Sequence, residues 1–380
     1  MDRQSIKIFI AGDVVPRNKT VELYKKAKVN SLFEDYKEIL ESSDINIVNF
    51  EAPIINGAIT PIKKSGPNLF TSKTTLKTLK DAGFNCITLA NNHFRDQGNQ
   101  GVIDTINAAK EMQMDFVGGG ENINDAKQIK YIKTKEKVIT LINVCESEYS
   151  IATNDYGGSN PIDIISLYND INEAKTKSDY IIVISHGGTE LYNLPTPRMK
   201  RLFRHIIDLG ADVVINHHQH CFSGYEVYKG KTIFYGLGNF NFDSNKKVNE
   251  CWFYGYSVIL NIGKEVKFDI VPHEQCKEDG QTRILKDQAE FWTTIGHLNN
   301  IIADDDELQS KFNDMAIMKA KGYLTNFEPY NSRIPNKLFR MGLLPKTFNK
   351  NKLLILLNYL RCESHNDVLK EILDYKINKQ

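Results

Sequence analysis

The sequence lacks the marks of a nucleic-acid-binding protein, a zinc ribbon or a dinucleotide-binding domain. Its 48 basic residues nearly balance 47 acidic ones, so a net charge of +1 gives no overall field that would attract nucleic acid or anionic lipid. The six cysteines are scattered and form no Cys-x-x-Cys pair, which favours reduced core thiols over disulfides or a structural zinc site. The glycines that end Phe116–Gly120 do not have the G-x-G-x-x-G spacing of a dinucleotide fingerprint.

Long apolar segments are also missing. The N-terminal residues 1–13 enter a short apolar strand without a signal peptide or a bilayer-crossing span, so we expect a cytoplasmic protein, with peripheral membrane association left open. A chain of 380 residues suggests one large domain with an attachment. We place the domain in residues 1–285 and a helical extension in residues 286–380, which could be a lid, a partner-docking unit or an oligomer contact.

What the sequence does contain is a cluster of histidines after an apolar run. Residues Ala211–Ile215 predict a buried strand, and His217, His218 and His220 follow at its end. In α/β enzymes such strand ends hold the active-site residues. In extended backbone His218 and His220 would point to one face and could address one metal ion or two neighbouring ions. Histidines that only make hydrogen bonds are the alternative at this point.

Two earlier strands end in carboxylates. The apolar run Ile6–Ile10 leads to Asp13, which is a candidate metal ligand or a strand-end cap. The run Ile45–Phe50 brings Asn49 and Glu51 to the next strand end, where they share a face because they lie two residues apart.

The loop after the strand Cys86–Ala90 is crowded with polar groups. It contains Asn91, Asn92, His93 and Asp96 within six residues. Turn chemistry could explain the two amides, but it gives no reason for His93.

A fifth strand, Tyr180–Ser185, ends in His186 and Glu190 beside two glycines that allow a ligand to approach closely. Successive strand-helix-strand units place the carboxyl ends of parallel strands at one edge, so we expect the five strand ends to converge. Carboxylate, amide and imidazole ligands suit one or two Mn, Fe or Zn ions, which would acidify a water and clamp the oxygens of a displacement at phosphorus. His93 would then protonate the leaving oxygen or stabilise charge on the phosphoryl group.

The order of these motifs resembles that of the capsule synthesis protein CapA family, also called the poly-γ-glutamate synthesis PgsA family. The motifs run from about Ile6 to Asp243 and read G-D, N-x-E, L-A-N-N-H-x-x-D-x-G, H-G-G-x-E, A-D-V-V-x-x-H-x-H and Y-x-L-G-N-F. The family looks like a branch of the calcineurin-like metallophosphoesterases. The resemblance therefore implies an α/β fold, a four-layer α/β/β/α sandwich, here followed by the helical extension.

The resemblance also implies roles for the site residues. Glu51 stands where a bridging carboxylate belongs, with Asn92, His186 and His218 holding one metal and Asp13 and His220 the other. The expected catalytic residues are His93 and Asp96. The expected substrate contacts are Arg17, Asn49, Asn91 and Glu190.

One departure from the metallophosphoesterase pattern concerns the first motif. That pattern has Asp-x-His, whereas Val15 stands two residues after Asp13 here, so the first metal is short of a ligand. Arg17 in the same loop is a candidate for holding an anionic substrate group.

We therefore expect a metal-dependent hydrolase that cleaves a phosphoester or related bond during capsule or exopolymer production. Its expected partners are an anionic polymer or a phosphorylated small molecule, and capsule synthase components. A non-catalytic accessory protein that binds a polymer or a synthase complex is the alternative. Cleavage of a γ-glutamyl amide by the same activated water is a third reading.

Overall fold

A computed structural model describes residues 5–134, 137–244, 248–324, 333–345 and 349–378. Within these residues the strands form a sheet of eight, a sheet of six and a two-stranded ribbon. The larger sheet contains β1 (Ile6–Val15), β2 (Ile45–Phe50), β3 (Cys86–Thr88), β4 (Asp115–Val117), β13 (Asn239–Phe242), β14 (Tyr254–Ile262), β15 (Val266–Gln275) and β16 (Thr282–Ile284). The smaller sheet contains β6 (Lys130–Lys133), β7 (Val138–Cys145), β9 (Tyr180–His186), β10 (Val213–His217), β11 (Tyr225–Tyr228) and β12 (Lys231–Phe234). The ribbon pairs β5 (Gly119–Gly120) with β8 (Gly158–Ser159).

Some helices end or begin at residues that cap them. Gly83 ends α4 with a φ of 109°, a conformation that glycine adopts without strain, and the Thr196 side chain accepts the N–H of Met199 at the start of α8. The described α-helices are α1 (Lys19–Lys25), α2 (Asn30–Phe33), α3 (Lys37–Glu41), α4 (Lys73–Ala82), α5 (Gly98–Glu111), α6 (Ile123–Ala126), α7 (Ile164–Lys177), α8 (Pro197–Leu209), α9 (Ala289–Ala303), α10 (Asp305–Leu324), α11 (Arg333–Arg340), α12 (Lys350–Arg361) and α13 (Glu363–Asn378). Two 3₁₀ turns are η1 (Glu34–Tyr36) and η2 (Glu250–Phe253).

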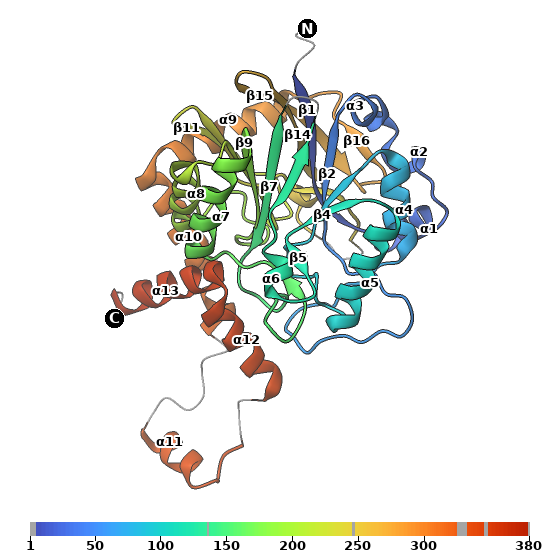
Figure 1. Cartoon of the computed structure of the whole chain (residues 1–380). Coiled ribbons are helices and arrows are strands. Elements are labelled where there is room, and N and C mark those ends of the chain that lie inside the picture. Colours follow the sequence, from blue (N-terminus) through green and yellow to red (C-terminus); the bar gives the residue numbers. More distant parts are fainter. Residues whose placement is uncertain (1–4, 135–136, 245–247, 325–332, 346–348, 379–380) are drawn as a thin grey trace.

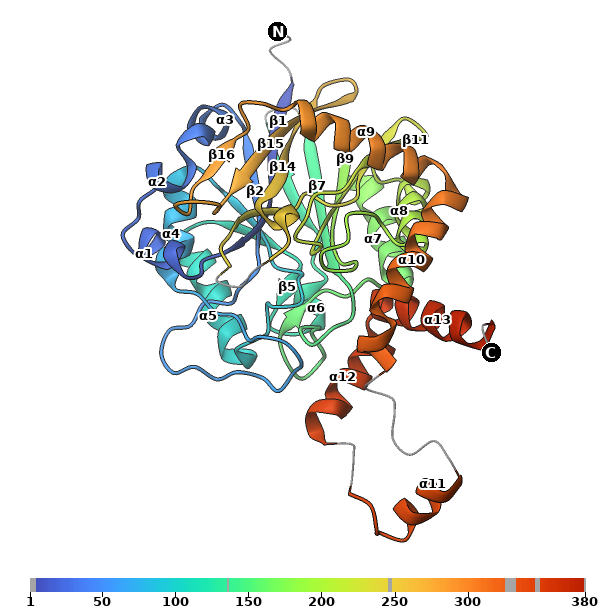
Figure 2. The ribbon, with the colours of Figure 1, turned by 180° about the vertical axis from the view of Figure 1, so that it is seen from behind.

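The strands lie in the middle of the molecule, with helices on either side (Figures 1 and 2). One buried apolar cluster joins side chains of both sheets, such as Ile10 and Ile47 from the larger sheet and Ile184 and Val213 from the smaller. A second cluster packs α4 and α5 on the larger sheet, and a third packs α7, α8 and α9 on the smaller. The predicted α/β fold with two sheets between helices is thus confirmed.

The strand register places the carboxyl ends of parallel strands at a common level. In the larger sheet Asp13 pairs with Asn49 and also with Asn239, and in the smaller sheet His217 pairs with His186. The ladder shifts register between Ala11 and Asp13. Gly12 is needed there because a Cβ atom at this position would lie 2.0 Å from the carbonyl oxygen of Gly238.

The C-terminal helices contact the body in two ways. Phe291 and Ile295 of α9 pack into the cluster between the sheets, whereas α10 and α13 share an apolar cluster of their own around Phe312 and Ile372. Helices α12 and α13 lie beside the lower end of the sheets in Figures 1 and 2. The boundary between residues 285 and 286 stays a prediction. None of the described helices combines the length and apolarity that crossing a bilayer requires.

Candidate metal centre

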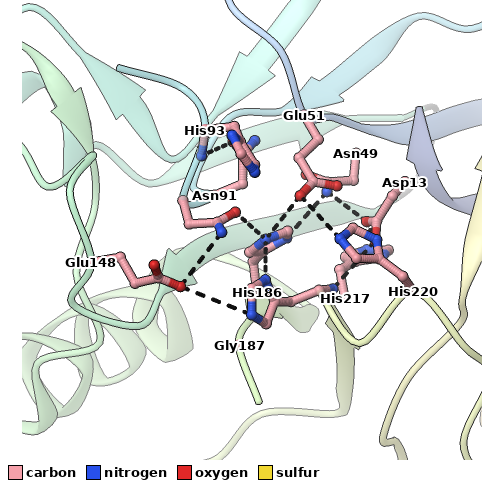
Figure 3. Close-up of polar contacts among 12 residues, drawn as sticks. Asp13, Asn49, Glu51, Asn91, His93, Glu148, His186, Gly187, His217 and His220 are labelled. Atoms are coloured by element: carbon pink, nitrogen blue, oxygen red, sulfur yellow. Dashed lines mark hydrogen bonds and ion pairs between the residues drawn. The ribbon is translucent and has the colours of Figure 1, made fainter. Parts of the chain in front are cut away.

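The five strand ends that the sequence singles out meet at one place between the two sheets (Figure 3). Asp13, Glu51 and His186 are almost completely buried, and so are the histidines that follow β10. Two sets of residues here could each hold a metal ion, because the possible ligand atoms inside each set lie within 4.8 Å of one another. Both sets include Glu51. We call Asp13, Glu51 and His220 the aspartate group, and Glu51, His186 and His218 the double-histidine group.

Glu51 links the two groups. Its Oε1 atom lies 3.6 Å from Nε2 of His186 and 3.8 Å from Nε2 of His220. Both carboxylate oxygens are buried and have no hydrogen-bond partner among the described residues. Burial and the nearby Asp13 raise the pKa of Glu51 well above its ordinary value, because neither favours a second negative charge. A cation between the two groups would satisfy this carboxylate.

The aspartate group is already rich in contacts within the protein. Asp13 Oδ1 accepts a hydrogen bond from Asn49 Nδ2 at 2.7 Å, and Asp13 Oδ2 lies 3.2 Å from Nδ1 of His220. Burial alone would raise the pKa of Asp13, but the contact with His220 and the charges of neighbouring imidazoles hold it well below its ordinary value. Burial alone would lower the pKa of His220, but Glu51 and Asp13 raise it to about 10. This group therefore favours positive charge between its carboxylates.

In the double-histidine group, imidazole nitrogens of His186 and His218 lie close to each other and to an amide oxygen. Nε2 of His186 lies 3.1 Å from Nδ1 of His218 and 3.1 Å from Oδ1 of Asn92. Burial and the neighbouring His218 hold the pKa of His186 well below its ordinary value, so its imidazole is neutral, the form that binds metals. One hydrogen on Nε2 can serve only one of these contacts, so the arrangement suits a shared cation better than a hydrogen-bond network.

The backbone after β10 differs from the expected extended chain. The strand ends at His217, and His218 and His220 have φ values of 93° and 55°. The expectation that extended geometry aligns these two histidines is therefore wrong, although both imidazoles still reach the centre. Positive φ is costly for residues with a Cβ atom and persists where the surroundings determine it, as it does at many functional sites.

His93 lies beside the centre and is held by a buried ion pair. Its Nδ1 atom lies 2.6 Å from Asp96 Oδ2, and Asp96 also pairs through Oδ1 with the ammonium group of Lys64. The Asp96 carboxylate is fully buried and accepts the N–H of Leu69 as well. Burial and the charge of Lys64 lower the pKa of His93, while Asp96 opposes them. Nδ1 thus has its partners within the protein.

The four expected substrate contacts lie in different surroundings. Asn49 is part of the centre, because its amide contacts both Asp13 and His186. Asn91 donates to the carbonyl of Phe50 and accepts the N–H of His93, so the protein occupies both ends of its amide.

Arg17 and Glu190 lie further out. Arg17 is half-buried two residues beyond the end of β1, and its backbone N–H donates to Thr20 Oγ1. Glu190 is exposed, and its carboxylate is close enough to interact electrostatically with His218.

Several residues at the centre were not expected from the sequence. Glu148 lies 3.4 Å from the amide of Asn92 and 3.9 Å from His218 Nε2, and it follows β7 as the other candidates follow their strands, so the same rule could have found it. Trp252 lies against the ring of His220. Lys64 belongs to a segment without helix or strand, where no periodic pattern points to it.

Comparison with known sequences identifies the chain's relatives. Residues 7–244 match the sequence model described as "Bacterial capsule synthesis protein PGA_cap". The capsule biosynthesis protein CapA of Bacillus anthracis is 33% identical over 250 residues, which cover 64% of this chain and 61% of that protein. The PGA biosynthesis protein CapA of Bacillus subtilis is 34% identical over 235 residues, covering 61% of this chain and 62% of that protein. The chain thus spans about three fifths of the length of these two relatives.

Among solved structures, the chain is similar to a calcineurin-like phosphoesterase from Bacillus subtilis. The two share 12% sequence identity with a TM-score of 0.41, over 79% of this chain and 99% of that one.

Proposed function

Because the chain belongs to the bacterial capsule synthesis protein family, we propose that it is a metal-dependent hydrolase acting on a phosphoester or related bond in capsule or exopolymer production. The observation that carries this proposal is Glu51. A buried carboxylate with two unpaired oxygens between two clusters of ligand atoms is costly unless a cation compensates it.

The residues present fit divalent ions. The donor set consists of carboxylate and amide oxygens with imidazole nitrogens, which suits Mn, Fe or Zn. We assign one ion to Asn92, His186 and His218 and a second to Asp13 and His220, with Glu51 serving both. Ions held there would acidify a water molecule and offset charge on the phosphoryl oxygens.

His93 is our candidate for the general acid. Asp96 accepts the Nδ1 proton and stabilises the imidazolium against burial and the charge of Lys64, and from that form Nε2 can give a proton to a leaving oxygen. The ion pair between Lys64 and Asp96 fixes the carboxylate in turn, which keeps the ring oriented.

Arg17 and Glu190 are our candidates for contacting the substrate. Arg17 lies just beyond the strand that carries Asp13, and we assign it to an anionic group of the substrate, which a guanidinium can bind with two hydrogen bonds. Exposed Glu190 is placed to contact a polar group beside the double-histidine group. An anionic polymer or a phosphorylated small molecule would fit these contacts, with capsule synthase components as protein partners.

The first test combines metal content with turnover. Purified protein is analysed for bound elements, and hydrolysis of p-nitrophenyl phosphate and bis-p-nitrophenyl phosphate is assayed with added Mn²⁺. We expect bound metal and turnover in the wild type, and less bound metal with a loss of turnover in His218→Ala. His205→Ala, which removes an exposed imidazole on α8, is the matched control and should change neither. A wild type that stays metal-free and inert after Mn²⁺ addition would refute the hydrolase.

The second candidate is a non-catalytic accessory protein, and Val15 is the observation that favours it. Val15 is buried against Ala52, Leu69 and Phe242, at the position where the metallophosphoesterase pattern has a histidine. An incomplete aspartate group could bind a polymer or a synthase complex without turning it over. This reading predicts metal bound to the double-histidine group together with no turnover of either phosphate ester.

A further inference from the structure

A third cluster of ligand atoms lies where the C-terminal helices meet the end of β7. Its members are Glu148, Cys362 and His365, whose possible ligand atoms all lie within 4.8 Å of one another. Glu148 follows β7, Cys362 is the C-cap of α12, and His365 lies in the first turns of α13. The cluster shares no residue with the aspartate group or the double-histidine group.

Neighbouring side chains hold this cluster in place. The hydroxyl of Tyr323 lies 2.6 Å from Nδ1 of His365, which leaves Nε2 of the ring for another partner. Tyr323 in turn stacks on Tyr359 of α12. Asn358 Nδ2 lies 3.4 Å from Oε2 of Glu148. Partners of this kind orient metal-binding imidazoles and carboxylates in known sites.

The local charges also call for a cation. The neighbouring carboxylate Glu146 is paired with Arg198 and accepts a hydrogen bond from Ser364 at 2.7 Å. By contrast, the ion-pair contact found for Glu148 among the described residues is the imidazole of His218. The Cys362 side chain is only 2% exposed and lies among these carboxylates.

We propose that Glu148, Cys362 and His365 bind a zinc ion, separate from the centre between the sheets, that fastens α12 and α13 to the end of β7. Thiolate, imidazole and carboxylate are all zinc ligands, and three protein ligands leave a fourth position for water or another group. The thiolate makes this site softer than the centre, whose ligands are oxygen and nitrogen atoms. The sequence pattern does not reveal this site, because Glu148 lies more than 200 residues before Cys362 and His365.

The zinc site would also support the centre. Glu148 Oε1 lies 3.4 Å from Nδ2 of Asn92 and 3.9 Å from Nε2 of His218. An ion on Glu148 would fix the carboxylate that contacts Asn92 and His218. Docking of the C-terminal helices would therefore affect the geometry of the double-histidine group.

The test uses the full chain, freed of metal with a chelator and titrated with Cd²⁺, which gives a thiolate-to-metal absorption band. We expect this band in the wild type and in His218→Ala, but not in Cys362→Ser. Cys251→Ser is the matched control, because Cys251 and Cys221 lie within contact and are the competing thiols. The band should persist in this control.

Zinc counting gives the second readout. Metal-free protein reloaded with Zn²⁺ should hold one equivalent fewer in Cys362→Ser than in the wild type, and His365→Gln should weaken zinc binding about 10-fold or more. If Cys362→Ser does not fold, as judged by circular dichroism, Glu148→Gln and His365→Gln give the same reading. A band that survives in Cys362→Ser, or a wild type without a band, would overturn the zinc site while leaving the proposed hydrolase untouched.

Discussion

The two halves of the centre share Glu51 but differ in how far the protein already satisfies them. In the aspartate group, Asp13 takes hydrogen bonds from Asn49 and from the N–H of His218, and Nδ1 of His220 lies 2.9 Å from Asn239 Oδ1. In the double-histidine group, the ring nitrogens of His186 and His218 face each other with few protons to share. The first half has separate partners for its carboxylate and its imidazole, whereas the second has one hydrogen on His186 Nε2 for two acceptors.

The surroundings differ in the same direction. His220 lies against the rings of Phe242 and Trp252, with centroid distances of 5.2 and 5.0 Å. The double-histidine half instead faces polar groups, among them Glu148 and Asn92. We infer that the double-histidine half holds its ion more tightly and that the aspartate half is the weaker site.

The largest effect is expected where the two halves meet. Glu51→Gln removes the one carboxylate that serves both halves. The affinity for both ions and the turnover of bis-p-nitrophenyl phosphate should therefore fall by more than about 100-fold, which exceeds the effect of losing a residue that only supports a ligand. Elemental analysis and steady-state kinetics measure this.

Thermal unfolding of the metal-free protein is the control for Glu51→Gln. The metal-free variant should melt at the same or a higher temperature than the metal-free wild type, because it no longer buries an unpaired acid. A variant that keeps both ions would show that Glu51 does not join the halves.

Next comes the direct contrast between the halves. His186→Ala should abolish tight metal binding, whereas His220→Ala should leave one ion bound and weaken only the second, by about 10- to 100-fold. Isothermal titration with Mn²⁺ separates the two affinities. Equal losses in both variants would contradict the ranking of the two sites.

Much of this centre could be predicted because of one rule of α/β folds. Asp13 and Glu51 lie at the carboxyl ends of neighbouring parallel strands in the larger sheet, and His186 lies at the end of a strand in the smaller sheet. Packing of the two sheets on each other brings the three residues together. The α/β fold could be predicted from the same apolar runs, since Ile6–Ile10, Ile45–Phe50 and Tyr180–Ser185 lie in β1, β2 and β9.

The remaining features depend on long-range packing. Lys64 reaches Asp96 from an irregular segment, and His365 reaches Glu148 only because α13 docks on the body. The left-handed backbone of His218 is also set by its surroundings, since nothing in the local residue pattern favours a positive φ there. Such contacts have no periodic signature in a sequence.

Adding a ligand to the aspartate group should raise its affinity for a metal ion. Val15→His adds an imidazole on the face of β1 that carries Asp13, because residues two apart in a strand share a face. We expect the second Mn²⁺ to bind about 10-fold more tightly, while overpacking against Leu69 and Phe242 lowers the free energy of unfolding by about 1–3 kcal/mol. Val15→Phe is the control for size, and should lose stability without gaining affinity.

The smallest effect on the centre at neutral pH is expected from His273, which supports the aspartate half from behind. Its Nε2 lies 2.9 Å from the carbonyl of Asn239, whose side chain contacts His220, and its Nδ1 lies 2.9 Å from the hydroxyl of Tyr36. Burial lowers the pKa of His273 to about 4, below the value of about 6.5 expected in the unfolded chain.

The sign of the pH dependence follows from which state binds the proton. Between pH 6.5 and 4 the unfolded chain binds the proton and the folded protein does not. The free energy of unfolding therefore falls as the pH drops through this window, and the contribution of neutral His273 is fully present above it. His273 should therefore cost about 2 kcal/mol of unfolding free energy between pH 7 and 5. Urea unfolding of His273→Gln should show a pH dependence flatter by that amount, whereas exposed His205→Gln should follow the wild type. If the His273→Gln profile matches the wild type, this buried base does not support the aspartate half through its neutral form.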